Sequence, residues 1–286
     1  MRINLILATL ISVLILTYSC RKEVSNEDGL KGDGIITDSL PADYAFANGF
    51  CPGVTLGISI DSIPVYQPDT SSIPPLSVRL DAPTSGNQGT QGSCTAWAVV
   101  YGLGSYYVHT NTGKAYSDTG NLSPKYTFNQ ITKGNCTCTS LIDNLYILQQ
   151  QGAASLGVMP YDPSECLLQP TDLQMQNAAS ARIKGFSSVD MQNLTLIKHA
   201  LVNKKSVVFA IAVDHGFEQL KSPFIWKAHT DSTGQSHALL IIGYDDSKNS
   251  LRILNSWSTR WADNGEAWID YDFFLKYVIR NGYVLN

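Results

Sequence analysis

Helix-like and strand-like patterns occupy different halves of this chain, and this separation limits the fold more than any other feature. Helical patterns fall at 95–109, 124–132 and 140–151, with Gly152 placed to cap the third. Short apolar runs at about 182–189, 206–213, 237–244, 250–256 and 266–270 predict strands, and one short helix is expected at 194–203. Elements that are segregated in this way, rather than alternating, indicate an α+β fold.

The first 20 residues predict export. Arg2 precedes an apolar run from Leu5 to Leu16, which is short for a membrane span and typical of a signal peptide. The ending Thr17-Tyr18-Ser19-Cys20 resembles a bacterial lipobox, so we expect residues 1–19 to be removed and Cys20 to be lipidated. The acyl chains would anchor the protein to a membrane of the bacterial cell envelope, facing the periplasm or the cell exterior. Two alternatives stay open: a secreted protein that is cleaved nearby, and a buried first helix.

Residues 20–75 are poor core formers and are expected to be a flexible linker. They include the polar, Gly-rich stretch RKEVSNEDGLKGDG and the stretch QPDTSSIPP, which interrupts regular structure. The more apolar FCPGVTLGISI, around Cys51, is expected to pack on the domain as a strand. Residues 76–286 then form the main domain, which is long enough for a sizeable core. The formal net charge of −4 provides no basic patch, so nucleic acid is not an expected partner.

The stretch NQGTQGSCTAWAVVYG places Cys94 at the start of an apolar helical pattern. Ser93 is the expected N-cap, and a thiol at a helix N-terminus is stabilised as the thiolate by the helix macrodipole. Gln88, on the glycine-rich loop before it, is placed to curl back and offer its amide to an oxyanion. The alternative is a structural cysteine, because a lone buried cysteine usually acts as a small hydrophobic residue.

A nucleophilic cysteine needs a base, and histidines at 109, 199, 215, 229 and 237 compete for that role. The first two fall in helical patterns and the next two in loops. His237 instead opens the apolar strand HALLIIGYDD, where a rigid sheet would orient its ring. Asn255 ends the next apolar strand, 18 residues later, and antiparallel pairing of the two strands would bring the side chains together. Asn255 is then expected to accept a hydrogen bond from the imidazole and to fix its tautomer.

With these four residues in place, the chain resembles papain-like cysteine proteases in a bacterial lipoprotein form. Gln88, Cys94, His237 and Asn255 follow the family's order in the contexts NQG-x-QGSC, SHALLIIGYDD and LNSWSTRWADNGEAWI. The histidine and asparagine lie 143 and 161 residues after the cysteine. The first separation falls within the family's usual range of about 130–150 residues, and the second is slightly longer. The likeness extends from Leu76 to the C-terminus.

The resemblance implies a two-lobe fold, with a helical N-terminal lobe packed on an antiparallel, barrel-like C-terminal lobe. Cys94 would lie on one wall of the cleft between them, with His237 and Asn255 on the other. It also implies hydrolysis of peptide bonds through an acyl-enzyme, starting from an imidazolium–thiolate pair. Gln88 and the Cys94 N–H would bind the oxyanion, and Trp257 would shield the His–Asn hydrogen bond. The expected partner is a protein or peptide substrate of a monomeric enzyme that needs no metal or organic cofactor.

Several positions depart from the family pattern and leave the substrate open. Thr95 replaces the usual Trp after the nucleophile, and Gln91 stands where many members have a disulfide cysteine. The glycine pair whose backbone binds extended substrate has no clear counterpart in GNCTCTSLID, where Thr139 or Ser140 falls near that position.

Two residues beside the base bear on specificity. Ala238 matches a position that often lines the main specificity pocket, and Ser236 replaces a commonly acidic residue. Two other functions stay open on this evidence: a non-catalytic papain-like module that binds peptides or a partner, and a thiol amidase or acyl-transferase.

Four further cysteines, Cys51, Cys136, Cys138 and Cys166, are disulfide candidates in an exported protein. A bridge between the second and third would be badly strained, which leaves two of the three connectivities. By similarity, Cys166 pairs with one of them, and Cys51 with the other, joining the N-terminal segment to the domain. Free buried cysteines are the alternative. A zinc site at the CxC pair is disfavoured because no second ligand pair has suitable spacing.

Overall fold

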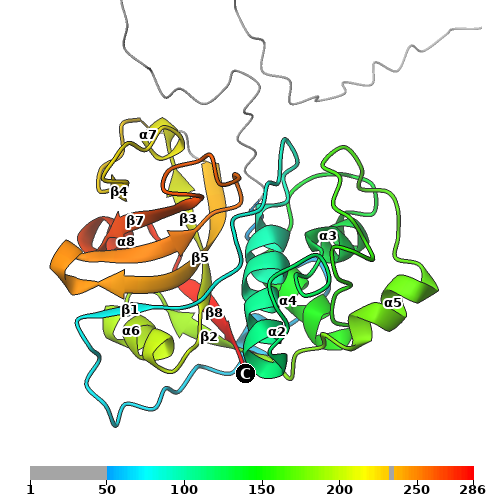
Figure 1. Cartoon of the computed structure of the whole chain (residues 1–286), viewed down its shortest axis with the longest axis horizontal. Coiled ribbons are helices and arrows are strands. Elements are labelled where there is room, and N and C mark those ends of the chain that lie inside the picture. The colour runs from blue at the N-terminus through cyan, green and yellow to red at the C-terminus, as the bar shows by residue number, and fades with distance from the viewer. Residues whose placement is uncertain (1–49, 232–234) are drawn as a thin grey trace, which may run out of the picture. The chain divides into compact units, whose positions relative to one another are not determined.

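The helices of the first half of the chain gather in one lobe and the strands of the second half in another, as the computed structural model shows (Figure 1). The structure describes residues 50–231 and 235–286, all within the unit Ser39–Asn286. The expected signal peptide, Cys20 and the first part of the expected linker, residues 20–49, lie outside the described residues. The two-lobe α+β expectation is confirmed.

One long helix forms the centre of the helical lobe. It begins as α1 (Cys94–Ala96), continues as the π-helical segment η2 (Trp97–Gly104) and ends as α2 (Ser105–Thr112). Residues 93–106 are all buried, because the apolar run has no polar face and is surrounded by protein. Gly113 ends the helix at φ +73°, a left-handed conformation that glycine adopts without strain.

Three shorter helices complete this lobe, and each has a start signal in the sequence. They are α3 (Pro124–Thr132), α4 (Leu141–Gln150) and α5 (Asp172–Ala179). Helix α3 begins with a proline, whose missing N–H is not needed in the first turn. Ser140 caps α4 by accepting a hydrogen bond from the Asp143 N–H at 3.0 Å, and α5 begins with a capping box between Thr171 and Gln174.

The strand lobe is an eight-stranded sheet in the order β2-β8-β3-β5-β6-β7-β4, with β1 beside β5. The strands are β1 (Ser77–Arg79), β2 (Phe186–Asp190), β3 (Val207–Val213), β4 (Ile225–Trp226), β5 (Gln235–Asp245), β6 (Ser250–Leu254), β7 (Glu266–Asp270) and β8 (Asn281–Leu285). Helices α6 (Leu194–Val202), α7 (His215–Glu218) and α8 (Tyr271–Tyr277) interrupt them. Since β2 and β4 end the order without a recorded pairing between them, the term barrel-like describes the lobe only loosely.

Strand β5 lies between two apolar cores. Its side chains alternate between faces, so Ala238, Leu240 and Ile242 pack in the same core as Cys94 and the central helix. Leu239 and Ile241 belong to the second core, together with α6, α8 and a group of aromatic residues. Strand β5, which contains the expected base His237 near its start, therefore packs directly behind the helix that begins at the expected nucleophile, Cys94.

The expected elements lie close to the observed ones, with several omissions. Helix 124–132 is observed with those bounds, and the helix at 140–151 is observed as Leu141–Gln150 with Gly152 at φ +82° just after it. The sequence patterns did not predict α5, α7, α8, β1, β4 or β8.

Part of the expected linker packs on the domain. Cys51 N–H donates to the Thr139 carbonyl at 3.0 Å, and Tyr66 N–H donates to the Ser188 carbonyl at 2.8 Å. The buried Asp143 carboxylate accepts hydrogen bonds from the backbone N–H groups of Thr55 and Leu56. We call residues 50–75 the covering segment, because hydrogen bonds attach it to the domain. This part of the expected linker is therefore in contact with the domain.

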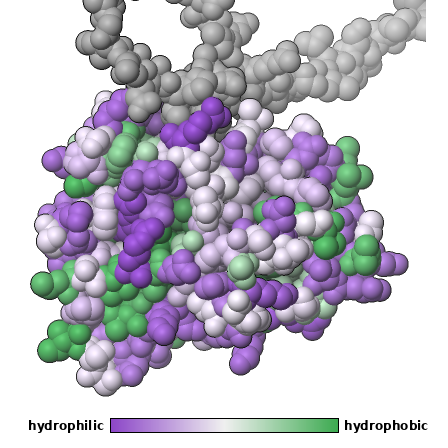
Figure 2. All heavy atoms as spheres, viewed as in Figure 1, coloured by the Kyte–Doolittle hydropathy of each residue, from purple (hydrophilic) through white to green (hydrophobic). Residues whose placement is uncertain are grey.

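The visible surface is mostly polar, with apolar residues gathered around β1 and around α5 (Figure 2). The exposed large hydrophobic residues are Leu56, Ile60, Val65, Ile73 and Leu76 in the covering segment and its end, and Leu167, Leu168, Leu173 and Met175 in and before α5. Within residues 50–231 and 235–286, no helix is both long enough and apolar enough to span a membrane.

Candidate active site

Cys94 is the first residue of the central helix and is fully buried. The helix starts here because the Trp97 N–H donates to the Ser93 carbonyl at 3.0 Å. Ser93 occupies the N-cap position, as expected, but its side chain makes no capping hydrogen bond. Its hydroxyl lies 2.7 Å from the hydroxyl of Tyr161 instead. Cys94 is the one cysteine outside a disulfide among the described residues.

His237 and Asn255 meet as the strand pattern predicted. Strands β5 and β6 pair antiparallel, and Asn255 directly follows β6. His237 Nε2 lies 2.7 Å from Asn255 Oδ1, which also accepts a hydrogen bond from the Ser256 N–H at 2.7 Å. His237 Nδ1 has no hydrogen-bond partner within the described part of the chain. The contact with Asn255 therefore assigns the N–H to Nε2 and leaves Nδ1 as the nitrogen that can exchange a proton.

Aromatic rings enclose the His–Asn pair. The Trp257 ring stacks on His237 at a centroid distance of 4.6 Å and an interplanar angle of 26°. Phe217, from α7, contacts the Trp257 ring edge-on at 5.4 Å, and its carbonyl accepts a hydrogen bond from Trp261 Nε1 at 3.2 Å. The exposed fraction of His237 is zero.

The enclosure changes the acid–base chemistry of His237. Burial penalises the charged imidazolium and lowers the pKa of His237 to about 4, while the hydrogen bond to Asn255 opposes this in part. The surroundings thus favour a neutral imidazole, which works against the imidazolium–thiolate pair expected from the resemblance. A neutral His237 is a proton acceptor for a neighbouring thiol.

Gln88 reaches the same site through a pairing of two loops. Residues 85–88 run beside residues 255–258: Ser85 Oγ donates to the Asn255 carbonyl at 2.8 Å, and the Ser258 N–H donates to the Gly86 carbonyl at 2.7 Å. The Gln88 side chain is fully buried, and its Oε1 accepts a hydrogen bond from Ser256 Oγ at 2.7 Å. Its Nε2 donates to the Gln91 carbonyl at 3.0 Å. The four residues singled out in the sequence thus come from segments that contact one another: α1 contacts β5, and the Gln88 loop contacts the Asn255 loop.

The two residues assigned to specificity lie on β5. Ala238 is 1% exposed and lines a small interior space with Trp97 and Leu254, and Ser236 is half-buried opposite Ala212. Their roles in selecting substrate stay predictions.

The segment expected near the family's glycine pair lies next to the nucleophile helix. The Thr139 hydroxyl contacts the Thr95 hydroxyl and accepts a hydrogen bond from Asn144 Nδ2 at 2.9 Å. On its other side, the Thr139 carbonyl accepts from Cys51 N–H, and Phe50 pairs with Thr139 as a parallel bridge. The segment around Thr139 is therefore held by contacts of the Thr139 side chain and by backbone pairing with residues 50 and 51.

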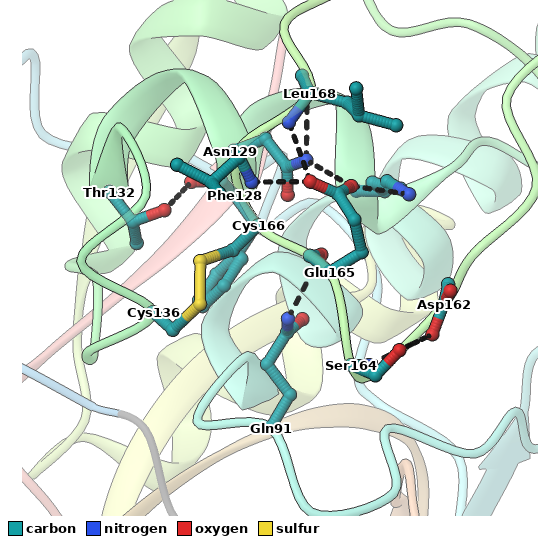
Figure 3. The surroundings of a disulfide bond; sticks show 12 residues. Gln91, Phe128, Asn129, Thr132, Cys136, Asp162, Ser164, Glu165, Cys166 and Leu168 are labelled. Carbon is teal, nitrogen blue, oxygen red and sulfur yellow. Dashed lines mark hydrogen bonds and ion pairs between the residues drawn. A yellow bond between two sulfur atoms is a disulfide. The ribbon is translucent and has the colours of Figure 1, made fainter.

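Two disulfides form, Cys51–Cys138 and Cys136–Cys166, which is one of the two connectivities left open. The second joins the loop that contains Glu165 and Cys166 to the chain just after α3 (Figure 3). No group of histidine, cysteine and carboxylate side chains suited to a metal occurs in the described ranges.

Sequence reasoning missed two residues that contact the site. Ser256 lies inside the Asn-Ser-Trp triplet that was noticed, but adjacency alone does not show that its hydroxyl bonds to Gln88. Tyr161 lies five residues before Cys166, and only that cysteine of the stretch MPYDPSEC was a candidate residue. No spacing rule connects it to a loop 70 residues earlier.

The fold and the site geometry define a two-lobe α+β domain with a buried cysteine at a helix start and a His–Asn pair on the facing sheet. The family model for papain family cysteine proteases matches residues 81–279. The chain belongs to that family. A solved structure of xylellain, a cysteine protease from Xylella fastidiosa, superposes with a TM-score of 0.72 at 20% identity, covering 87% of this chain and 98% of that one.

Two other proteins show the breadth of the likeness. A cysteine protease from Carica candamarcensis, solved in complex with E-64, gives a TM-score of 0.57 at 19% identity and covers 74% of this chain and 98% of that one. Gamete and mating-type specific protein A of Dictyostelium discoideum is 27% identical over 179 residues, or 63% of this chain. The match spans only 38% of the length of that relative.

Proposed function

We propose that this protein is a cysteine-type peptidase that hydrolyses peptide bonds with Cys94 as nucleophile, His237 as base and Asn255 as the residue that orients the base. The observation that supports this most directly is the buried hydrogen bond between His237 Nε2 and Asn255 Oδ1 at 2.7 Å, which leaves Nδ1 to exchange a proton.

The reaction follows from a neutral His237. Its Nδ1 takes the proton of the Cys94 thiol as the sulfur attacks the substrate carbonyl carbon, and a tetrahedral oxyanion forms. The resulting imidazolium donates that proton to the leaving amine, the C–N bond breaks, and a thioester remains on Cys94. His237 then accepts a proton from water, whose oxygen attacks the thioester carbonyl carbon. The C–S bond breaks, the acid is released, and the imidazolium returns the proton to the Cys94 sulfur.

The oxyanion needs donors that are already in place. Gln88 Nε2 has two protons, of which one goes to the Gln91 carbonyl. We assign this amide group, together with the Cys94 backbone N–H at the helix start, to the oxyanion. Because Ser256 Oγ donates to Gln88 Oε1 at 2.7 Å, the orientation of the side-chain amide, and with it of Nε2, is fixed.

Access to the site requires movement. Cys94 and His237 are both fully buried, so a substrate reaches them only after neighbouring chain moves aside. The complex of the Carica candamarcensis relative with E-64 supports the use of an epoxysuccinyl reagent to probe the thiol here.

The two disulfides fit an oxidising compartment. We extend the proposal to a protein exported to the bacterial cell envelope and anchored through a lipidated Cys20. Mass spectrometry of the N-terminal peptide from membrane-bound protein tests this, and an unmodified Cys20 in that peptide would exclude the anchor.

The test of the peptidase proposal is covalent labelling with an epoxysuccinyl peptide, combined with turnover of a fluorogenic peptide library. Wild type should be labelled at Cys94, and both labelling and turnover should be lost in Cys94→Ala and fall by about 10²-fold or more in His237→Ala. Gln88→Ala should lose about 10²- to 10³-fold in kcat and keep the labelling site. His199→Ala is the matched control, because His199 is a second buried histidine, on α6, outside the site.

Each alternative function gives a different result. A folded wild type that neither labels nor turns over peptides indicates a binding module. New isopeptide or amide products without free peptide termini indicate an acyl-transferase. Loss of activity in His199→Ala equal to that in His237→Ala would remove the evidence that His237 is the base.

A further inference from the structure

The loop that contains Gln88 is bonded on two sides. On the sheet side, Gln88 N–H donates to the Ser256 carbonyl at 2.9 Å, and the Ser256 hydroxyl bonds to the Gln88 side chain. On the helical side, one residue outside the loop makes several contacts with it. That residue is Tyr161, from the connection between α4 and α5.

The Tyr161 hydroxyl contacts three residues between Gln88 and Cys94. It lies 2.9 Å from the Gln88 carbonyl oxygen, 2.9 Å from Gln91 Oε1 and 2.7 Å from Ser93 Oγ. A phenol has one proton to donate and oxygen lone pairs to accept with. Tyr161 therefore shares its one proton between the first two oxygens and accepts from the Ser93 hydroxyl. A single hydroxyl thus joins both ends of the loop.

Tyr161 itself is firmly placed. Its ring meets the Trp97 ring edge-on at a centroid distance of 4.9 Å, just after the start of the central helix. Burial, to which the nearby Asp162 and Cys94 charges add, raises the pKa of Tyr161 to about 12. The hydroxyl thus stays protonated at neutral pH, and it remains a donor to the loop.

The chain after Tyr161 is attached to helix α3. The Gln91 side chain donates to the Glu165 carbonyl, and the Glu165 carboxylate bonds to Asn129 Nδ2 at 3.1 Å (Figure 3). The same carboxylate forms an ion pair with the nearly buried Lys125 at 2.7 Å, and Cys166 is in disulfide linkage with Cys136. Helix α3 therefore supports the segment 161–166, and that segment supports the Gln88 loop.

We propose that Tyr161 is a positioning residue, which sets the place of the Gln88 amide relative to Cys94 through its hydroxyl. The inference rests on the proposed function, because it assigns Tyr161 an effect on the oxyanion donor. It accounts for the glutamine at position 91, where relatives often have a disulfide cysteine: hydrogen bonds through Tyr161 and Gln91 provide the attachment at this end of the loop. Tyr161 does not touch the reacting atoms.

The test is Tyr161→Phe, which removes one oxygen atom. We expect kcat to fall by about five- to thirtyfold, because a shifted donor no longer meets the oxyanion. KM should stay within about twofold, since ground-state binding does not use that donor. The pH dependence of kcat should keep the wild-type shape, because Tyr161 transfers no proton. In a Gln88→Ala background the same substitution should change kcat by less than about twofold.

Tyr126→Phe is the matched control. Tyr126 is a buried tyrosine on α3 whose hydroxyl donates to Gln151 Oε1 at 3.1 Å and touches no part of the loop. Its kcat should equal that of wild type. Gln91→Leu provides a second variant, and it should lower kcat less than Tyr161→Phe and, again, only while Gln88 is present.

The outcomes separate this inference from the proposed function. A wild type without peptidase activity contradicts both. An active wild type with unchanged kcat in Tyr161→Phe contradicts the positioning role alone. A loss that persists in full in the Gln88→Ala background, or that appears equally in Tyr126→Phe, also overturns it.

Discussion

At the scale of single residues, the site depends on a histidine that is completely enclosed. Trp257 covers one face of the His237 ring, and Asn255 bonds to one of its nitrogens. Both contacts favour the orientation of the ring, but burial disfavours its charge. The same packing that fixes the tautomer therefore keeps His237 neutral in the free enzyme, because burial lowers its pKa.

This conflict predicts how stability depends on pH. The pKa of His237 is lowered from 6.5 to about 4 on folding, so the unfolded chain binds more protons between these values. The contribution of the neutral His237 to the free energy of unfolding is fully present above pH 6.5. It is lost as pH falls from 6.5 towards 4, and the loss is at most about 3 kcal/mol. The free energy of unfolding of wild type minus that of His237→Gln, measured by urea titration at several pH values, should decrease over that window. The carboxylates common to both proteins cancel in the difference.

A pH-independent difference between wild type and His237→Gln would contradict this prediction. It would mean that His237 titrates alike in the folded and unfolded chain.

The sequence was informative about residues whose chemistry is local. Cys94 before an apolar helix, and His237 and Asn255 at the ends of consecutive strands, could be found from patterns of a few residues each. Ser256 and Tyr161 could not, because their importance depends on which distant segments lie against Gln88. Burial of His237, and with it the lowered pKa, was equally invisible, since it depends on Phe217 and Trp261 from other segments.

At the scale of elements, local signals located α3 and α4 well because each has its own start signal and an apolar face. Strand β8 was missed for a physical reason. It inserts between β2 and β3, pairing Leu285 with Phe186 and Tyr283 with Val208. Its stability therefore comes from partners about 75 to 100 residues away, which no local pattern records.

The end of helix α4 provides a prediction with an internal control. Gly152 has φ +82°, and an added Cβ would lie 2.0 Å from the Ala178 carbonyl oxygen. Gly113, at the end of α2, has φ +73°, and a Cβ added there would have no heavy atom within 4 Å. Gly113→Ala should cost about 1 kcal/mol from the left-handed backbone alone. Gly152→Ala should cost at least about 3 kcal/mol, because the backbone of α5 must also move.

Guanidinium titration of both variants measures the difference. Equal losses would show that the backbone of α5 yields easily at Ala178. In that case the close approach of α4 and α5 would not depend on the absence of a side chain at Gly152.

At the scale of the whole molecule, the covering segment is attached to the helical lobe by two independent means. The Asp143 carboxylate is fully buried and accepts from the Thr55 and Leu56 N–H groups and from the Thr55 and Ser140 hydroxyls. The Cys51–Cys138 disulfide joins the same segment to the chain beside Thr139. A segment without helices of useful length can be ordered in this way because its backbone donors find partners on the domain.

The two disulfides should differ in their effect on stability. Cys51–Cys138 joins residues 87 apart in sequence, and Cys136–Cys166 joins residues 30 apart. In the chain-entropy model, removing the first should cost about 4–5 kcal/mol and removing the second about 3–4 kcal/mol, since the longer loop regains more freedom in the unfolded chain. The variants are Cys51→Ala with Cys138→Ala, and Cys136→Ala with Cys166→Ala, compared by denaturant unfolding under non-reducing conditions.

Peptide mass mapping without reduction must first find the pairs 51–138 and 136–166 in the wild type. A free thiol at Cys51, or a peptide joining it to Cys136, would contradict the connectivity. A larger loss from removing the shorter loop would contradict the entropic ranking, and it would indicate that the native contacts around Cys166 matter more than loop length. Those contacts include the Glu165 interactions with Lys125 and Asn129. In that case Cys136→Ala with Cys166→Ala should also lower kcat in the way expected of Tyr161→Phe, because the segment 161–166 would lose its attachment to α3.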